Sequence, residues 1–189
     1  MGRAAERILD AMEAEIRSRT QWDEAPALFT MYLKAGECRL RQLPVPEPFW
    51  SADAPPRVLA RIADCLGEFT WLLQSAAPEG LHGAAFRCEA WAVDAGLPGT
   101  ERRSEVSAAS MAKQLHVHPD RVESRCLYAV DRAGITYSAL QARGDAEVRR
   151  GVSYPKPGKA SVSGIIPTAL DRLVTAFLGV EIPTRTRAG

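Results

Sequence analysis

The residues with the clearest chemical potential are His116, His118 and Asp120, which lie in a His-Val-His-Pro-Asp run. In an extended chain, side chains separated by one residue point to the same side, and imidazole and carboxylate groups are common ligands of divalent metals. A catalytic metal needs about three protein ligands. Because the chain has only 3 histidines, a further ligand would have to be His82 or Glu123. The run predicts, as one alternative, a metal-binding protein or a metal-assisted hydrolase.

The same run has a simpler interpretation as a polar loop leading into a strand, with Pro119 and Asp120 making the turn. Arg121 also stands where metallohydrolase runs of this type often carry another histidine. Because the ligand requirement is barely met, the loop interpretation is favoured and no cofactor is expected.

Two further patterns come close to catalytic motifs but fail. Six residues separate Gly151 from Gly158, where a phosphate-binding loop has four, and Ala160 stands where that loop needs a hydroxyl residue. Pro155 replaces the final glycine of a nucleophile elbow around Ser153. With no catalytic arrangement left, the sequence favours a protein that is not an enzyme.

Charged residues alternate with apolar ones on two predicted strands. Arg87 and Glu89 on one strand, and Glu123 and Arg125 on the other, are expected to form cross-strand pairs on a solvated sheet face. Trp91 belongs to the same face, and an aromatic residue among charges is typical of an interface. The sequence therefore predicts a partner-binding surface at Trp91, Arg87, Glu89 and Arg125, with Trp50 as a second aromatic contact in a proline-rich crossover.

The four cysteines, Cys38, Cys65, Cys88 and Cys126, are widely spaced and form no Cys-x-x-Cys pair. Each lies among apolar neighbours, which favours small core residues over a disulfide framework, and Cys126 is expected to be an inert buried thiol. No run has the length of a signal peptide or a membrane span. We therefore expect a reducing, cytoplasmic setting.

The balance of 24 basic against 23 acidic residues gives a formal charge of +1. This charge offers no electrostatic attraction to nucleic acid or to an acidic membrane, so neither is expected as a partner. The 20 arginines against 4 lysines fit a GC-rich genome of bacterial or phage origin, because arginine codons are GC-rich.

Hydrophobic periodicity predicts three amphipathic helices and five to six strands. The helices are expected at 4–19, after Pro55–Pro56, and from Pro167 to Gly179; the strands at 28–33, 38–43, 81–93, 121–131, 134–143 and, as a short edge strand, 148–154. Short turns between strands predict an α+β fold with a mainly antiparallel sheet, in the order α-ββ-α-β-ββ(β)-α, with the helices on one face. Ile135, Tyr137 and Ala139 are expected on the same side of the sheet as Val130.

The length fits one domain over residues 1–189, with an N-terminal helix in 1–20, surface loops at 94–119 and 151–164, and a tail at 181–189. Taken together, these patterns predict a non-enzymatic protein that binds another protein in an accessory, adaptor, immunity or assembly role. A homodimer is one form that this binding could take.

Overall fold

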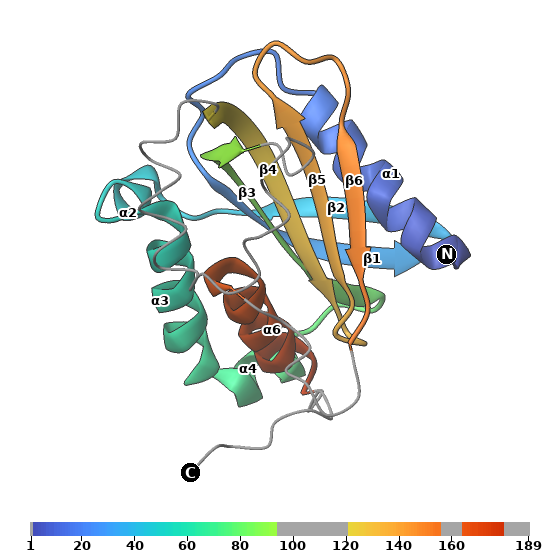
Figure 1. Cartoon of the computed structure of the whole chain (residues 1–189). Coiled ribbons are helices and arrows are strands. Elements are labelled where there is room, and N and C mark those ends of the chain that lie inside the picture. The colour runs from blue at the N-terminus through green and yellow to red at the C-terminus, as the bar shows by residue number, and fades with distance from the viewer. Residues whose placement is uncertain (1, 94–120, 156–163, 180–189) are drawn as a thin grey trace.

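The computed structural model describes residues 2–93, 121–155 and 164–179 (Figure 1). These residues form one six-stranded sheet in the order β2-β1-β3-β4-β5-β6, in which every neighbouring pair is antiparallel. The strands are β1 (Ala27–Lys34), β2 (Glu37–Leu43), β3 (Leu81–Val93), β4 (Arg121–Asp131), β5 (Thr136–Ala142) and β6 (Arg149–Ser153). The α+β class and the antiparallel sheet predicted from the sequence are confirmed.

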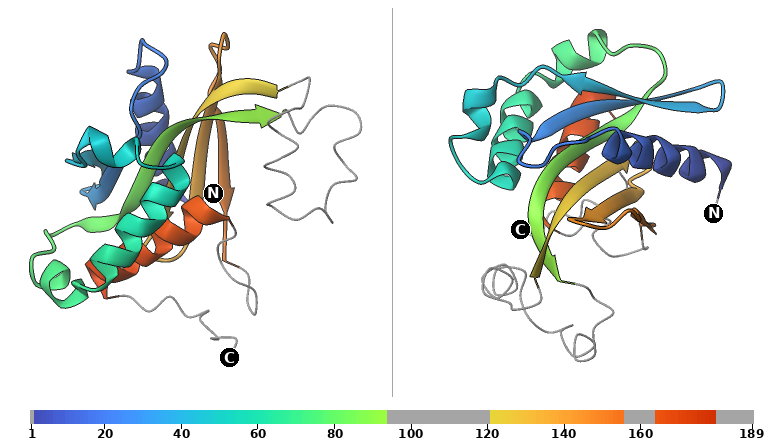
Figure 2. Two further views of the ribbon diagram at one scale, coloured as in Figure 1. Left: turned by 90° about the vertical axis from the view of Figure 1, so that its left-hand side faces the viewer. Right: turned by 90° about the horizontal axis from the view of Figure 1, so that it is seen from above.

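Helices lie on both faces of this sheet, whereas the sequence predicted helices on one face (Figures 1 and 2). They are α1 (Arg3–Arg17), α2 (Glu47–Trp50), α3 (Pro55–Gly67), α4 (Thr70–Ser75) and α6 (Ile165–Leu178). None of the helices among the described residues is long and apolar enough to cross a membrane.

The first face is covered by α1. Its apolar stripe of Ile8, Leu9, Met12 and Ile16 is buried against β1, β4 and β5. Glu13 and Arg17, four residues apart, form an ion pair at 2.8 Å. Such a pair adds only about 0.2–0.5 kcal/mol, so burial of the stripe is what holds the helix in place.

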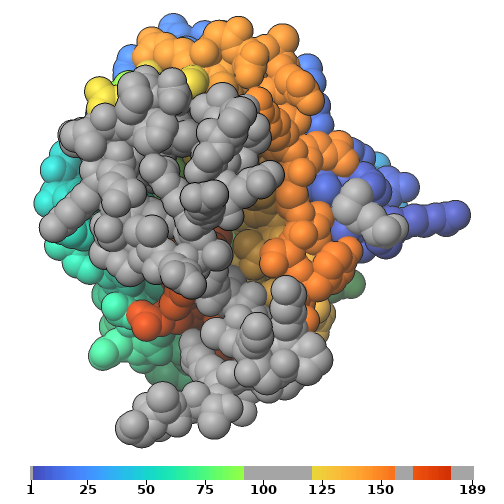
Figure 3. Space-filling view, viewed as in Figure 1, coloured from blue at the N-terminus to red at the C-terminus, as the bar shows by residue number. Residues whose placement is uncertain are grey.

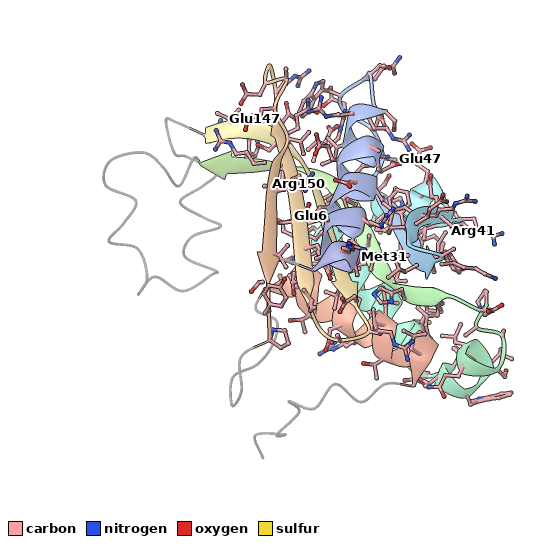
Figure 4. All side chains as sticks on the ribbon, turned by 90° about the vertical axis from the view of Figure 1, so that its right-hand side faces the viewer. Glu6, Met31, Arg41, Glu47, Glu147 and Arg150 are labelled. Atoms are coloured by element: carbon pink, nitrogen blue, oxygen red, sulfur yellow. The ribbon has the colours of Figure 1, made fainter. Side chains whose placement is uncertain are left out.

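Arg150 on β6 ties the same helix to the edge of the sheet. Its guanidinium lies 2.7 Å from Glu6, 3.0 Å from Asp10 and 3.2 Å from Glu13 (Figure 4). The hydrogen bond from Arg150 lowers the pKa of Glu13, while burial of that carboxyl opposes the shift. Three carboxylates at helical spacing therefore converge on one arginine.

The second face is covered by α6 and, beside it, α3. Leu170, Leu173 and Val174 of α6 are buried with Phe86 and Val130 of the sheet. Gly179 ends α6 in the left-handed conformation, as the sequence predicted, and its N–H donates to Thr175. The helix begins two residues before Pro167, which the first turn tolerates.

Three local features were not indicated by the patterns described above. A short helix, α2, begins at Glu47 in the proline-rich crossover, where Pro48 in the first turn needs no donor. The helix that follows Pro55 ends at Gly67, and a separate helix, α4, comes after it. In the crossover Phe49 is exposed, whereas Trp50 is buried.

The register of β4 and β5 places Tyr137 on the opposite face from the one predicted. Ala129 pairs with Tyr137 and Leu127 with Ala139, so both β5 residues lie under α1 and not beside Val130. A single residue of register moves every side chain to the other face, and turn length decides it.

Candidate functional site

An apolar groove of about 670 Å³ lies beside α3. It is walled by Leu28 and Leu43 of the β1–β2 edge, by residues 44–46 and Phe49 of the crossover, by Val58, Ile62, Cys65 and Leu66 of α3, and by Leu73 and Phe177. A concave apolar surface of this size is within the range of binding pockets in proteins. We take this groove as the candidate site.

The groove exists because the helices of the second face do not extend over the whole sheet. α6 contacts β3 and β4, so the inner side of the β1–β2 hairpin, including Leu28 and Leu43, is left beside α3. Trp50 pins the crossover at this place, with its ring 5.6 Å from that of Phe86. Trp50 itself is buried in the core of this face, and the neighbouring residues of the crossover line the groove.

Three large apolar side chains are exposed on the short helices at the two ends of α3. Phe49 on α2 is 58% exposed, and Trp71 and Leu72 on α4 are 72% and 48% exposed. Figure 3 shows this part of the chain along one edge of the molecule. Of the three, Phe49 lines the groove, whereas Trp71 and Leu72 precede the lining residue Leu73 in the chain.

One charged side chain, Arg61, lines the groove. Its guanidinium lies 3.5 Å from Asp53, and Arg57 lies 3.7 Å from the same carboxylate. Cys65, also in the lining, is exposed. The groove therefore combines an apolar floor with one cation and one accessible thiol.

Arg87 and Arg125, expected on a solvated face, are buried, at 5% and 1% exposed. The segment after α1 covers them: Arg125 donates to the carbonyls of Arg19 and Gln21 and lies 3.2 Å from Glu89. Arg87 donates to Glu24 at 2.7 Å. The cross-strand pairing of residues 89 and 125 is confirmed, but the solvated face is wrong for these arginines, because the sequence pattern did not reveal the covering segment.

The other predicted partner-binding residues are separated by the fold. Trp91 is 43% exposed at the far end of β3, where Arg121 stacks 4.8 Å from its ring centroid. Glu89 is half-buried beneath Arg125, and Trp50 is buried on the opposite face. Whether any of them contacts a partner stays a prediction, since the structure contains one chain.

A cluster of three carboxylates, Asp23, Glu89 and Glu123, brings its oxygens within 4.8 Å of one another. Each already has a cationic neighbour: Arg125 lies beside Glu89, and Arg143 beside Glu123 and Asp23. A metal ion would have to displace these guanidinium groups, so we interpret the cluster as an ion-pair network.

His116, His118 and Asp120 lie outside the described residues, so the metal alternative stays a prediction. Its two suggested further ligands are far apart, because His82 begins β3 and Glu123 pairs with Trp91 near its end. Nine residues of strand separate these positions, about 30 Å. At most one of the two could therefore join a metal site with the run.

His82 belongs to a different polar group, around the buried Asp131. One carboxylate oxygen accepts from the N–H groups of Ala133 and Ile135, which closes the β4–β5 turn. The other accepts from the Tyr137 hydroxyl at 2.8 Å and lies 3.8 Å from His82. Burial lowers the pKa of His82, so the ring is neutral near pH 7. These hydrogen bonds hold the β4–β5 turn, so we interpret the network as structural.

Comparison of the chain with protein-family models, with curated proteins and with solved structures finds no match. The fold and the groove together define the class of the molecule: an α+β protein with a six-stranded antiparallel sheet, helices on both faces and an apolar groove at one edge.

The groove was missed by the sequence patterns, although its parts were visible. The proline-rich crossover was identified from the sequence, but its position beside α3 depends on how the helices pack on the sheet. The signal that could have pointed to it is the excess of apolar residues in 69–73, more than one buried stripe requires.

Proposed function

We propose that this chain is a non-enzymatic protein that binds another protein, and that the groove beside α3 is where the partner docks. The observation that carries this proposal is the open 670 Å³ apolar groove itself, whose lining includes the exposed side chain of Phe49. An enclosed cavity would suit a small molecule alone, whereas an open groove with an apolar border offers the larger area that protein recognition needs.

The polar clusters of the described residues support the same proposal. Arg125, Glu89 and Asp131 are each engaged by neighbours that fix structure: backbone carbonyls, a guanidinium and a turn. The buried thiols of Cys88 and Cys126 have a pKa raised to about 12 by burial, which makes them poor nucleophiles. An accessory, adaptor, immunity or assembly role fits this surface.

Site-specific photo-cross-linking tests the proposal. A benzophenone maleimide attached to Cys65 places the reactive group in the groove, because this thiol is exposed there. The control is the variant Cys65→Ser with Ala133→Cys, which carries the same group on the exposed β4–β5 turn. Both labelled proteins are irradiated in an extract of the native host, and the cross-linked peptides are sequenced.

We expect the groove probe to cross-link one recurring segment of one partner, and the turn probe not to do so. Equal cross-linking from both positions, or no cross-link from Cys65, would contradict docking in the groove. Cross-links from Cys65 back to a second copy of the chain would assign the groove to a homodimer.

A further inference from the structure

We infer that the groove takes an amphipathic helix of the partner, with an acidic residue beside its apolar stripe that pairs with Arg61. This inference rests on the proposed function, because it specifies the partner for the same groove. It follows from three features: the apolar floor, the shortage of free backbone donors on the crossover and on α3, and the charge of Arg61.

The apolar floor of the groove requires an apolar stripe on the partner helix. Leu28, Leu43, Val58, Ile62 and Leu66 come from both walls and meet across the cavity. Burying a leucine-sized side chain here contributes about 1.5–3 kcal/mol, so a few such anchors at helical spacing supply most of the binding energy.

The walls favour a helix over an extended strand. On one side the crossover has proline at 44, 46 and 48, which carries no N–H to donate. On the other side the backbone of α3 is bonded within the helix. An extended peptide between these walls would leave its own backbone groups unpaired, whereas a helix satisfies them internally.

Arg61 sets the charge beside the stripe. It is the one charged side chain in the lining, and it shares Asp53 with Arg57 at 3.5 and 3.7 Å. Two guanidinium groups against one carboxylate leave an excess positive charge at the mouth of the groove. Asp64, one turn further along α3, is paired with Arg172.

Arg41 on β2 is a further cation near the groove, although it is outside the lining. It lies two residues before Leu43, so its side chain is on the groove side of the strand, and it extends outward at the edge of the molecule (Figure 4). Glu47 and Glu68 also lie on neighbouring segments outside the lining. The charge expected beside the stripe therefore depends on Arg61.

The test uses three synthetic peptides with the same leucine content. One has a leucine stripe flanked by glutamates, the second has the same stripe flanked by lysines, and the third has the glutamate composition in scrambled order. Binding is measured by fluorescence anisotropy, and occupation of the groove by the rate at which Cys65 is alkylated. The variant is Arg61→Glu, with Arg61→Gln as a milder second variant. Arg132→Glu, exposed in the β4–β5 turn, is the matched control.

We expect the glutamate peptide to slow alkylation of Cys65 and to bind about tenfold more tightly than the lysine peptide at low salt. Arg61→Glu should make the lysine peptide the tighter binder. Arg61→Gln should reduce the difference in affinity between the two peptides, and Arg132→Glu should leave that difference unchanged. High salt should shrink the difference between the two peptides, because the arginines are partly exposed.

Several outcomes would overturn the inference, and they separate it from the proposed function. If the lysine peptide binds as tightly as the glutamate peptide, the inference of an acidic flank is wrong, but docking in the groove is not contradicted. If the scrambled peptide binds as tightly as the glutamate peptide, the inference that the groove takes an amphipathic helix is wrong. If palmitate slows the alkylation of Cys65 and none of the peptides does, the groove binds an acyl chain. If alkylation slows as the protein concentration rises, the groove binds a second copy of the chain. No protection by any of these, combined with no cross-link from Cys65, removes the proposed function as well.

Discussion

The guanidinium of Arg125 lies over the ring of Trp22, 4.7 Å from the ring centroid. Arg125 comes from β4 and Trp22 from the segment that joins α1 to β1, so the contact fastens this segment to the sheet. The same guanidinium donates to the carbonyls of Arg19 and Gln21. One buried cation thereby holds a stretch of chain that has no regular secondary structure of its own.

Replacing Arg125 with methionine should destabilise the protein by about 3–5 kcal/mol, because Glu89 is left without its buried partner and two carbonyls lose their donor. Arg143→Met is the matched control, since Arg143 also stacks on Trp22, at 5.3 Å, but is largely exposed. Urea unfolding followed by circular dichroism measures both. If Arg125→Met destabilises the protein no more than the control does, the contacts of Arg125 with Glu89 and with the segment after α1 contribute little to stability.

Tyr137→Phe should cost about 1–3 kcal/mol, because it leaves a buried oxygen of Asp131 without its hydroxyl donor. Tyr154→Phe serves as the control, since that ring is 50% exposed. Thermal unfolding of the two variants gives the comparison. A Tyr137→Phe protein as stable as the parent would mean that another donor replaces the hydroxyl.

The stability of the protein should fall as the pH drops below about 6.5, the ordinary pKa of histidine. Burial lowers the pKa of His82 in the folded state, so the unfolded chain binds more protons in this range and is favoured by acid. The glutamine variant of His82 should lose this part of the pH dependence. Glu13, whose pKa is lowered by Arg150, adds a separate loss at lower pH, where its carboxylate becomes protonated. Unfolding midpoints between neutral and acidic pH test both; an unchanged profile in His82→Gln contradicts the assignment.

Cys65 should be the cysteine that iodoacetamide alkylates first in the native protein. It is exposed, whereas Cys88 and Cys126 are buried and have a pKa raised to about 12 by that burial. Cys38, half-buried with a pKa raised to about 11, should follow more slowly. Peptide mass mapping over time gives the order. Early labelling of Cys126 would show that the β3–β4 ribbon opens in solution.

Trp91→Glu should weaken self-association or partner capture without unfolding the chain, because this ring is 43% exposed at the end of β3. Light scattering and pull-down with the parent protein as the reference measure the effect, and circular dichroism checks the fold. An unchanged result on both measurements would mean that Trp91 is not part of an interface. Compared with the groove variants, Trp91→Glu distinguishes partner binding at the end of β3 from partner binding in the groove beside α3.

The elements were largely predictable from the sequence because each depends on local periodicity. The strand at 81–93 has the predicted bounds, and α1 lies within the predicted helix region 4–19 except for its first residue, Arg3. Pairing partners were less predictable: Cys88 and Cys126 lie directly opposite one another, although 37 residues lie between them in the chain. The groove was beyond prediction, since α3, the crossover and Phe177 meet only after the sheet has formed.

The sequence by itself determined the α+β class, the antiparallel hairpins and the inward stripes of the helices, because hydrophobic spacing and turn residues act over a few residues. Only the tertiary structure decided that α1 takes the face opposite α3 and α6, that Arg87 and Arg125 are buried, and that the β1–β2 edge stays open as a groove. The physical reason is that burial depends on which distant element covers a surface, and periodicity identifies an apolar or polar face without identifying its cover.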